Sequence, residues 1–258
     1  MTAPALAVDR LVKNFGGLRA TDAVSFEVAH GGFTAIVGPN GSGKTTLLNL
    51  VTNLYRPDSG AVHLYGTSIV GLTPGRIAAL GLVRTFQAAR VFPGMTVREN
   101  ALAGAHLHLH SPAWQQMLRL PRARAAERAL AAKADALLEL VGLADRLDAA
   151  ATDLPMGSQK LLEVVRALMA RPRLLLLDEP AAGLNDSETA ELAELLGAVR
   201  DTGTTLLVVE HNMALVMGMA DQVVVLDAGS VIARGTPAEI QKDSRVVEAY
   251  LGREEQAR

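Results

Sequence analysis

The chain has 258 residues, a formal net charge of −2 and no cysteine. Its length suits one α/β domain with a small insertion, and 49% hydrophobic residues suffice for a sizeable core without covalent staples. The lack of cysteine excludes disulfides, thiolate zinc sites and iron–sulfur clusters, and the near-neutral charge provides no basic field for nucleic acid.

No apolar run in the sequence approaches the length that crosses a bilayer. The longest candidates, Leu174–Leu177 and Val223–Leu226, both end at an aspartate. The first ten residues lack the basic-then-apolar order of a secretory signal. We therefore expect a soluble chain, or one that sits on a membrane by docking to another protein.

The first third of the chain is rich in strand patterns. Apolar and polar residues alternate from 5 to 37 and predict strands, with a turn at Gly16-Gly17. Phe33–Val37 is a short apolar strand that leads into a glycine-rich loop, and Thr45–Leu54 is typical of a helix. Ala61–Leu64 predicts one more strand.

Residues 93–165 differ in character, because prolines separate helical stretches such as the alanine-rich, charge-alternating Arg122–Leu140. An α/β alternation follows: helix 159–170, strand 173–178, helix 186–201, strand 204–210 and strand 222–227. We therefore predict an α/β core formed by residues 1–92 and 166–258, and a helical subdomain formed by residues 93–165.

Residues 38–45 match the phosphate-binding pattern G-x-x-x-x-G-K-[ST] between a predicted strand and a predicted helix. Glycines let backbone N–H groups face phosphates, and the following helix directs its positive end at the anion. Lys44 would supply a charge for the β- and γ-phosphates, and Thr45 a hydroxyl ligand for Mg²⁺. An ordinary glycine-rich turn is the alternative, and this sequence context disfavours it. The predicted nucleotide-binding residues here are Gly38, Pro39, Asn40, Gly41, Ser42, Gly43, Lys44, Thr45 and Thr46.

Four leucines followed by Asp178 and Glu179 predict a buried strand that ends in two acids. The carboxyl edge of such a strand is where α/β proteins bind ligands. Asp178 would hold Mg²⁺, directly or through water, and Glu179 would act as general base on the attacking water. A strand that is followed by a polar loop without a catalytic role would have the same sequence pattern, but the phosphate loop upstream favours the catalytic interpretation.

With further motifs, these segments resemble the ABC ATPase family over essentially the whole chain. The resemblance implies a P-loop NTPase (RecA-like) core with an N-terminal antiparallel β subdomain and an inserted α-helical subdomain, which bind ATP and Mg²⁺. It implies that Phe15 stacks on adenine, and that Gln87, in Arg84-Thr85-Phe86-Gln87, is a catalytic residue and Mg²⁺ ligand linked to the helical lobe. His211, after a strand, would reach the γ-phosphate and the water. A core phenylalanine and a satisfied histidine are the alternatives for Phe15 and His211.

The segment similar to the family's signature, L-S-G-G-Q, departs from it. Pro155 stands in place of the serine whose hydroxyl contacts the γ-phosphate across a dimer, and Asn185 in place of the usual aspartate of a dimer contact. An altered signature suits a heterodimer with a second ATPase subunit, and a homodimer stays open. The residues implied to act on the partner's ATP are Pro155, Met156, Gly157, Ser158 and Gln159.

Several stretches are similar to the ATP-binding subunits of branched-chain (hydrophobic) amino-acid importers, among them 84–87, 95–100, 179–185 and 210–218. This resemblance implies transmembrane permease subunits docked on the helical lobe, an indirect link to a periplasmic or extracellular solute-binding protein, and no nucleic acid. It places the chain peripherally on the cytoplasmic face of the plasma (inner) membrane. Urea or amide uptake, lipopolysaccharide export, a soluble non-transport ABC protein and a module that no longer hydrolyses ATP stay open.

Overall fold

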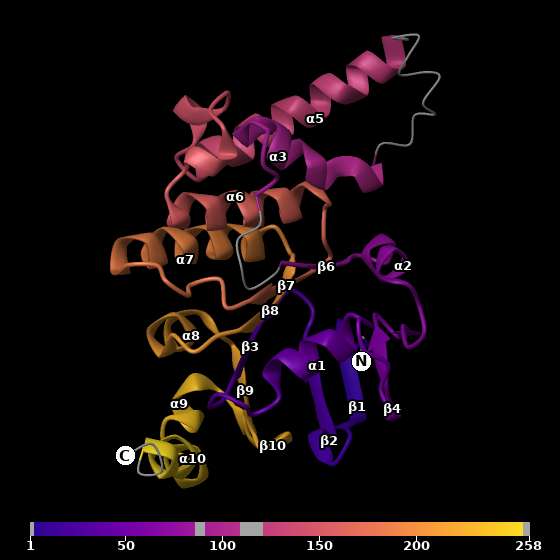
Figure 1. Ribbon diagram of the computed structural model, residues 1–258, viewed down its shortest axis with the longest axis vertical. Coiled ribbons are helices and arrows are strands. Elements are labelled where there is room, and N and C mark those ends of the chain that lie inside the picture. The colour runs from indigo at the N-terminus through magenta and orange to yellow at the C-terminus, as the bar shows by residue number, and fades with distance from the viewer. Residues whose placement is uncertain (1–2, 86–90, 109–120, 255–258) are drawn as a thin grey trace. The chain divides into compact units, whose positions relative to one another are not determined.

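The computed structural model of the chain describes residues 3–85, 91–108 and 121–254 (Figure 1). The chain forms two compact units. Unit 1 comprises Met1–Arg84, Arg173–Ala182 and Leu196–Arg258, and unit 2 comprises Thr85–Pro172 and Gly183–Leu195. The subdomain boundaries at 92–93 and 165–166 stay a prediction.

One sheet of unit 1 is antiparallel. Its strand order is β2-β1-β4-β5, and every neighbouring pair is antiparallel. Its strands are β1 (Leu6–Phe15), β2 (Leu18–Val28), β4 (Ser59–Leu64) and β5 (Thr67–Ser68). Gly16 connects β1 to β2 with φ +57°, as the predicted turn requires. Phe15 therefore ends β1, at the tip of a hairpin.

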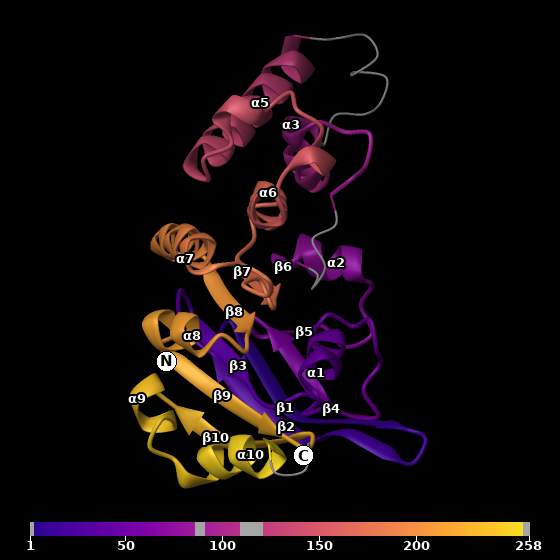
Figure 2. The ribbon, with the colours of Figure 1, turned by 60° about the vertical axis from the view of Figure 1, so that its left-hand side comes forward.

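The second sheet has the order β10-β9-β3-β8-β7-β6, and all pairs from β9 to β6 are parallel (Figure 2). Every residue of β3, β7 and β8 is buried, which explains their unbroken apolar sequences. The parallel strands end at one common edge, where the loops discussed below begin. The six strands are β3 (Phe33–Val37), β6 (Leu82–Arg84), β7 (Leu174–Asp178), β8 (Thr205–Val209), β9 (Gln222–Asp227) and β10 (Ser230–Gly235).

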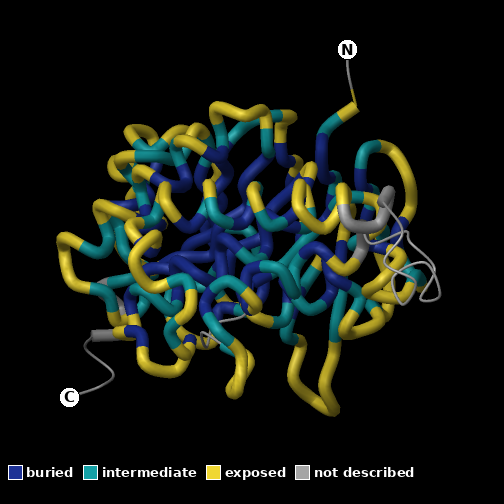
Figure 3. Tube along the Cα trace, turned by 90° about the horizontal axis from the view of Figure 1, so that it is seen from above, coloured by how far each residue is buried: buried dark blue, intermediate teal, exposed yellow. Residues whose placement is uncertain are grey.

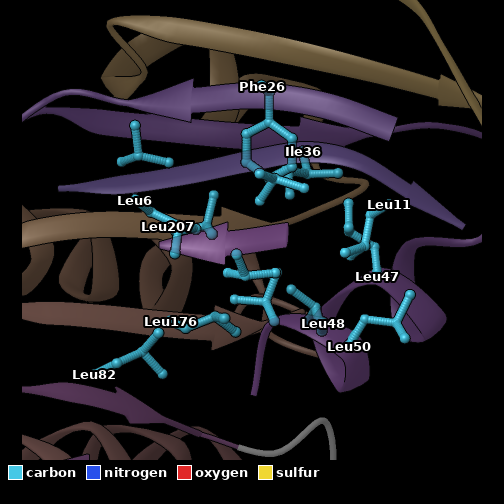
Figure 4. Close-up of a cluster of buried hydrophobic side chains, with 14 of the residues drawn as sticks. Leu6, Leu11, Phe26, Ile36, Leu47, Leu48, Leu50, Leu82, Leu176 and Leu207 are labelled. Atoms are coloured by element: carbon cyan, nitrogen blue, oxygen red, sulfur yellow. The ribbon is translucent and has the colours of Figure 1, made fainter. Parts of the chain in front are cut away.

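Apolar side chains from both sheets and from helix α1 (Lys44–Val51) form one core, whose members include Phe26, Ile36, Leu47 and Leu48 (Figure 4). Figure 3 marks such buried stretches in dark blue. Each fully buried side chain of this size contributes about 1.5–3 kcal/mol to folding. The helices that lie within unit 1 are α1 (Lys44–Val51), α2 (Pro74–Ala79), α8 (Met213–Met219), α9 (Pro237–Ile240) and α10 (Ser244–Glu254). Helix α7 (Asp186–Asp201) begins in unit 2 and ends in unit 1.

Unit 2 is helical. Its core joins Val97 and Ala101 of α3 to Leu138 of α5 and Leu162 of α6. Among the described residues, no helix is both long and apolar enough to span a bilayer, not even the 20-residue α5. The elements are α3 (Val97–Ala103), η1 (Gly104–His108), α5 (Pro121–Leu140), η2 (Ala144–Arg146), η3 (Ala151–Asp153) and α6 (Met156–Met169). The helix predicted at 122–140 is confirmed.

Gly104, directly after α3, lies against α6 in unit 2. A Cβ atom at this position would overlap the carbonyl oxygen of Arg166, so alanine must push two helices apart. We expect Gly104→Ala to lower the free energy of unfolding by about 1–3 kcal/mol. Urea denaturation followed by helical circular dichroism measures the change.

Gly197 offers a matched control. It lies in α7, and a Cβ there would meet nothing within 4 Å. Gly197→Ala should therefore raise the free energy of unfolding by up to about 1 kcal/mol, since alanine favours helix over glycine. Equal unfolding midpoints for both alanine variants would contradict the close packing at Gly104.

Candidate active site

The loop between β3 and α1 is built on glycines. Gly38 and Gly43 have φ values of +153° and +100°, which residues with side chains rarely adopt. A Cβ at Gly38 would collide with the Leu226 carbonyl, and one at Gly43 with the Ala20 carbonyl. The loop therefore packs tightly on its own unit, and only glycine fits at these two positions.

The polar groups of this loop fit a polyphosphate. Lys44 is buried, and its Nζ donates to the carbonyl oxygens of Gly38 at 2.8 Å and Pro39 at 3.0 Å, which places the ammonium beside the loop. The Ser42 Oγ is buried and has no hydrogen-bond partner within the described part of the chain. A phosphate oxygen would satisfy that hydroxyl and the ammonium together. Among the other predicted residues, Thr45 is exposed and Thr46 half-buried.

Asp178 ends β7, where it is buried and paired with Arg84 of β6. The Arg84 Nη2 to Asp178 Oδ2 distance is 2.8 Å. Arg84 Nη1 also donates to Asn49 Oδ1 on α1 at 2.7 Å and to Oγ1 of Thr52, directly after α1, at 3.2 Å. A buried carboxylate needs such a partner, because an unpaired charge in the interior is costly. Arg84 thus fixes Asp178 relative to the helix that follows the phosphate loop. A carboxylate together with the Thr45 hydroxyl is donor chemistry that fits Mg²⁺.

Glu179 and His211 lie together after neighbouring strands. Asp178 pairs with Val209 across β7 and β8, and the Glu179 N–H donates to the Val209 carbonyl at 2.9 Å. The Glu179 Oε2 lies 4.0 Å from His211 Nδ1. The His211 side chain is 59% exposed and that of Glu179 is 19% exposed. The structure therefore brings both predicted catalytic side chains to one edge, and His211 is not a core histidine.

Glu210, between them in sequence, is fully buried. Its Oε1 accepts from the Ala181 N–H at 2.6 Å, and its Oε2 accepts from the N–H groups of His211 at 2.9 Å and Asn212 at 3.0 Å. Sequence reasoning missed this residue. The available signal was an acid placed directly after the apolar strand β8, because a charge buried there needs hydrogen-bond donors or a charged partner.

Phe15 is 42% exposed, so the alternative of a core phenylalanine is wrong. Its ring meets Tyr55 edge-to-face at 5.4 Å between centroids, and Lys13 Nζ lies 5.5 Å from the Phe15 ring centre. A hydrogen bond from the Lys13 side chain and one from the Asn14 backbone lower the pKa of the exposed Asp58 beside them. Phe15 thus presents an exposed aromatic surface, and its stacking on adenine stays a prediction. Tyr55 was not foreseen.

The signature-like segment belongs to unit 2 and forms the start of α6. Pro155 is the N-cap, and its φ of −53° suits proline, but it provides no side-chain cap. Met156 is exposed, Ser158 is half-buried, and the Gln159 side chain donates back to the Leu154 carbonyl at 2.8 Å. The helix starts three residues before the predicted position. Gln87 lies outside the described residues.

Asn185 caps helix α7. Its Oδ1 accepts from the Glu188 N–H at 3.0 Å, and Glu188 Oε2 accepts from the Asn185 N–H at 3.0 Å. This reciprocal pair is a capping box, in which asparagine and aspartate serve equally well. Gly157 leaves room for the same Glu188 carboxylate. The departure at Asn185 therefore preserves local structure.

Comparison with known proteins identifies the family. Residues 21–182 match the ABC transporter family, and residues 230–256 match the family described as branched-chain amino acid ATP-binding cassette transporter. Two high-affinity branched-chain amino acid transport ATP-binding proteins, LivG of Salmonella typhimurium and BraF of Pseudomonas aeruginosa, are each 42% identical over 253 residues. Both alignments cover 98% of this chain and 99% of the relative.

Solved structures agree. An ATP-binding cassette of an ABC transporter in its ADP conformation has a TM-score of 0.83 and 34% identity, with 97% of this chain and 100% of that chain covered. A nucleotide-free cassette has a TM-score of 0.82 and 33% identity, with coverage of 96% and 98%. The fold class predicted from the sequence is confirmed. The chain belongs to the ABC transporter family. It is the ATP-binding subunit of such a transporter, an ATPase.

Proposed function

We propose that the chain is the ATP-hydrolysing subunit of an ABC importer that takes up branched-chain amino acids. The observation that carries the ATPase role is the common edge of β3, β7 and β8, where the phosphate loop, Glu179 and His211 meet. The cargo is supported by the two relatives that transport branched-chain amino acids and by the matching segment 230–256.

The phosphate loop would hold the triphosphate. Backbone N–H groups and the Lys44 ammonium face the β- and γ-phosphates, and the Ser42 hydroxyl supplies a further hydrogen bond. Thr45 and Asp178 would hold Mg²⁺, with Gln87 as a further ligand, and the ion would neutralise charge on the phosphate oxygens. Phe15 would stack on the adenine ring and fix the other end of the nucleotide.

Hydrolysis then needs a base and an orienting group. The Glu179 carboxylate accepts a proton from water as the water oxygen attacks the γ-phosphorus, and ADP departs with the electrons of the broken P–O bond. His211 lies 4.0 Å from Glu179 and is exposed at this edge, so its imidazole is able to contact the γ-phosphate and orient the water. The two side chains thus perform different parts of one step.

A second ATPase subunit would complete the site. In this arrangement, the N-terminus of the partner's signature helix faces the γ-phosphate held by this chain, since a helix N-terminus favours anions. This chain's own Pro155–Gln159 would face the partner's ATP, where Pro155 supplies no hydroxyl. A homodimer would place this altered segment in both ATP sites, whereas a partner with an intact signature would leave one site stronger than the other. The altered segment therefore favours a heterodimer.

Transport follows if ATP binding favours the closed dimer and product release reopens it, because a ligand shifts an equilibrium only by binding one state better. Unit 2 would dock the permease subunits on the cytoplasmic face of the membrane, and a solute-binding protein would deliver the amino acid to the opposite face. Gln87, at the start of unit 2, would report the state of the nucleotide.

A transport assay tests this function. The tagged chain is purified from host membranes with its bound subunits, reconstituted in vesicles with Mg²⁺-ATP, and supplied with the binding protein and labelled leucine. We expect ATP-dependent leucine uptake that unlabelled isoleucine and valine compete away and urea does not. Purification without a permease, or uptake of urea but not leucine, would contradict the proposal.

A further inference from the structure

Glu210 is a buried acid that none of the steps above employs. Its side chain has no exposed surface, although an ionised carboxylate in the interior is costly unless hydrogen bonds replace its water shell. Three backbone N–H groups provide that replacement, at 2.6, 2.9 and 3.0 Å from its two oxygens. The site is therefore built to hold a carboxylate at this position.

The three N–H groups come from two different loops. Oε1 accepts from Ala181, two residues after Glu179, whereas Oε2 accepts from His211 and Asn212 after β8. All of these residues lie in unit 1. One carboxylate thus joins the loop of the predicted base, Glu179, to the loop of His211, which is predicted to reach the γ-phosphate.

The Glu179 loop requires such support. Glu179 has a φ of +48°, a left-handed conformation that persists in a residue with a side chain only where its surroundings enforce it. Its carbonyl accepts from the Ala182 N–H at 3.1 Å, which closes a turn over residues 179–182. Glu210 holds the N–H of Ala181 inside this turn and so fixes the direction of the Glu179 side chain.

We propose that Glu210 is a positioning residue that sets the distance between Glu179 and His211 through the backbone amides of both loops. The inference rests on the proposed hydrolytic role of Glu179. Glu210 itself contacts no reacting atom, and its Oε2 lies 4.0 Å from His211 Nδ1. Loss of the carboxylate should impair the chemical step more than nucleotide binding, because the phosphate loop has its own supports.

Glutamine is the substitution that tests the two hydrogen-bonding oxygens of Glu210 with the least change in side-chain size. It has nearly the same size, but only one of its two terminal atoms accepts hydrogen bonds, and the other is an N–H donor. In Glu210→Gln, either the Ala181 N–H or those of His211 and Asn212 must face that donor. The link between the loops is then broken on one side while the core volume is preserved.

The experiment compares the full-length chain and its variants in the complex that they form in membranes. We expect Glu210→Gln to lower kcat about 10- to 100-fold, as small displacements of catalytic groups do, with an ATP dissociation constant within about twofold of the parent's. Adding Glu210→Gln to Glu179→Gln should leave the residual rate unchanged, because a positioning effect disappears with the group positioned. If Glu210 had a purely structural role, Glu210→Gln would lower the rate of the parent and the residual rate of Glu179→Gln by the same factor.

Asp221→Asn is the matched control. Asp221 also accepts a backbone N–H, that of Phe33 at 2.8 Å, but at the amino end of β3, away from the site edge. We expect its kcat to equal the parent's within about twofold, since it supports neither loop. Hydrogen exchange should meanwhile become faster at residues 179–182 and 210–212 in Glu210→Gln only.

The inference is overturned if Glu210→Gln has the same kcat as the parent. It is also overturned if the fold-loss in the double variant equals the product of the fold-losses in the two single variants. If the parent is active and Glu179→Gln inactivates it, the hydrolytic function is still supported, so failure of this inference is distinguishable from failure of the proposed function.

If Glu210→Gln lacks a cooperative unfolding transition, Glu210→Asp takes its place. Aspartate keeps the charge but is one methylene shorter, so a lowered kcat with unchanged ATP affinity supports the inference and an unchanged kcat overturns it.

Discussion

Replacement of Glu179 by glutamine should lower ATP turnover about 10²- to 10⁴-fold, the usual contribution of a general base. The amide keeps the shape of the side chain but cannot take the proton of the attacking water. Nucleotide affinity should stay within about twofold of the parent's, because Glu179 belongs to neither the phosphate loop nor the Mg²⁺ ligands. Phosphate release under saturating Mg²⁺-ATP measures the effect.

The same variant should accumulate the ATP-bound dimer, since binding still favours closure while hydrolysis no longer reopens it. Labelled ATP that stays with the full complex through size-exclusion chromatography detects this state. Glu248→Gln on α10 is the control, because the Glu248 side chain is exposed and has no part in the proposed hydrolysis. Parental turnover in Glu179→Gln would remove this residue from the role of base.

Much of the fold follows from local patterns. The strand predicted at Phe33–Val37 is β3 without change, and the strand predicted at 173–178 is β7 from Leu174. These strands were predictable because burial on both faces leaves only apolar residues in them. The same logic brought the phosphate loop, Glu179 and His211 to one edge, since parallel strands end together.

Helix ends were less predictable. Helix α1 was expected to continue to Leu54 but ends at Val51, where Thr52 Oγ1 bonds to the Leu48 carbonyl and Asn53 takes a left-handed φ of +57°. The Asn53 side chain donates instead to the carbonyl of Leu72, 19 residues away. Such a tertiary partner decides where a helix stops, and a local pattern contains no record of it.

Two parts of the site were missed for the same reason. Arg84 supports Asp178 from 94 residues away, and Glu210 holds Ala181 from 29 residues away. No local pattern connects Arg84 with Asp178, and the position of Glu210 after an apolar strand does not reveal which N–H groups it binds. Their purpose emerges only from three-dimensional pairing, in which a buried charge must find its counterpart or its N–H donors. The sequence thus predicts the groups proposed to bind the nucleotide better than the groups that hold them in place.

Replacement of Lys44 by alanine should weaken ATP binding about 100-fold or more, the cost of truncating one partner of a desolvated charge pair. The parent ammonium is already held beside the loop by the carbonyls of Gly38 and Pro39, so little ordering remains to be done when phosphate arrives. Titration with Mg²⁺-ATP by calorimetry measures the dissociation constant. Lys242→Ala is the control, because Lys242 is exposed between α9 and α10.

Lys44→Arg separates charge from fit. A guanidinium keeps the charge but is planar and longer than an ammonium, so it cannot sit between the same two carbonyls. We therefore expect the affinity of Lys44→Arg for ATP to fall as well.

Thermal unfolding gives an independent measurement, since ATP at 100 times its dissociation constant stabilises the parent by about 2.7 kcal/mol. At that ATP concentration, the alanine variant should gain less than about 0.5 kcal/mol. Equal stabilisation of both proteins would mean that the phosphates bind elsewhere, because no other described feature compensates for a missing cation in this loop.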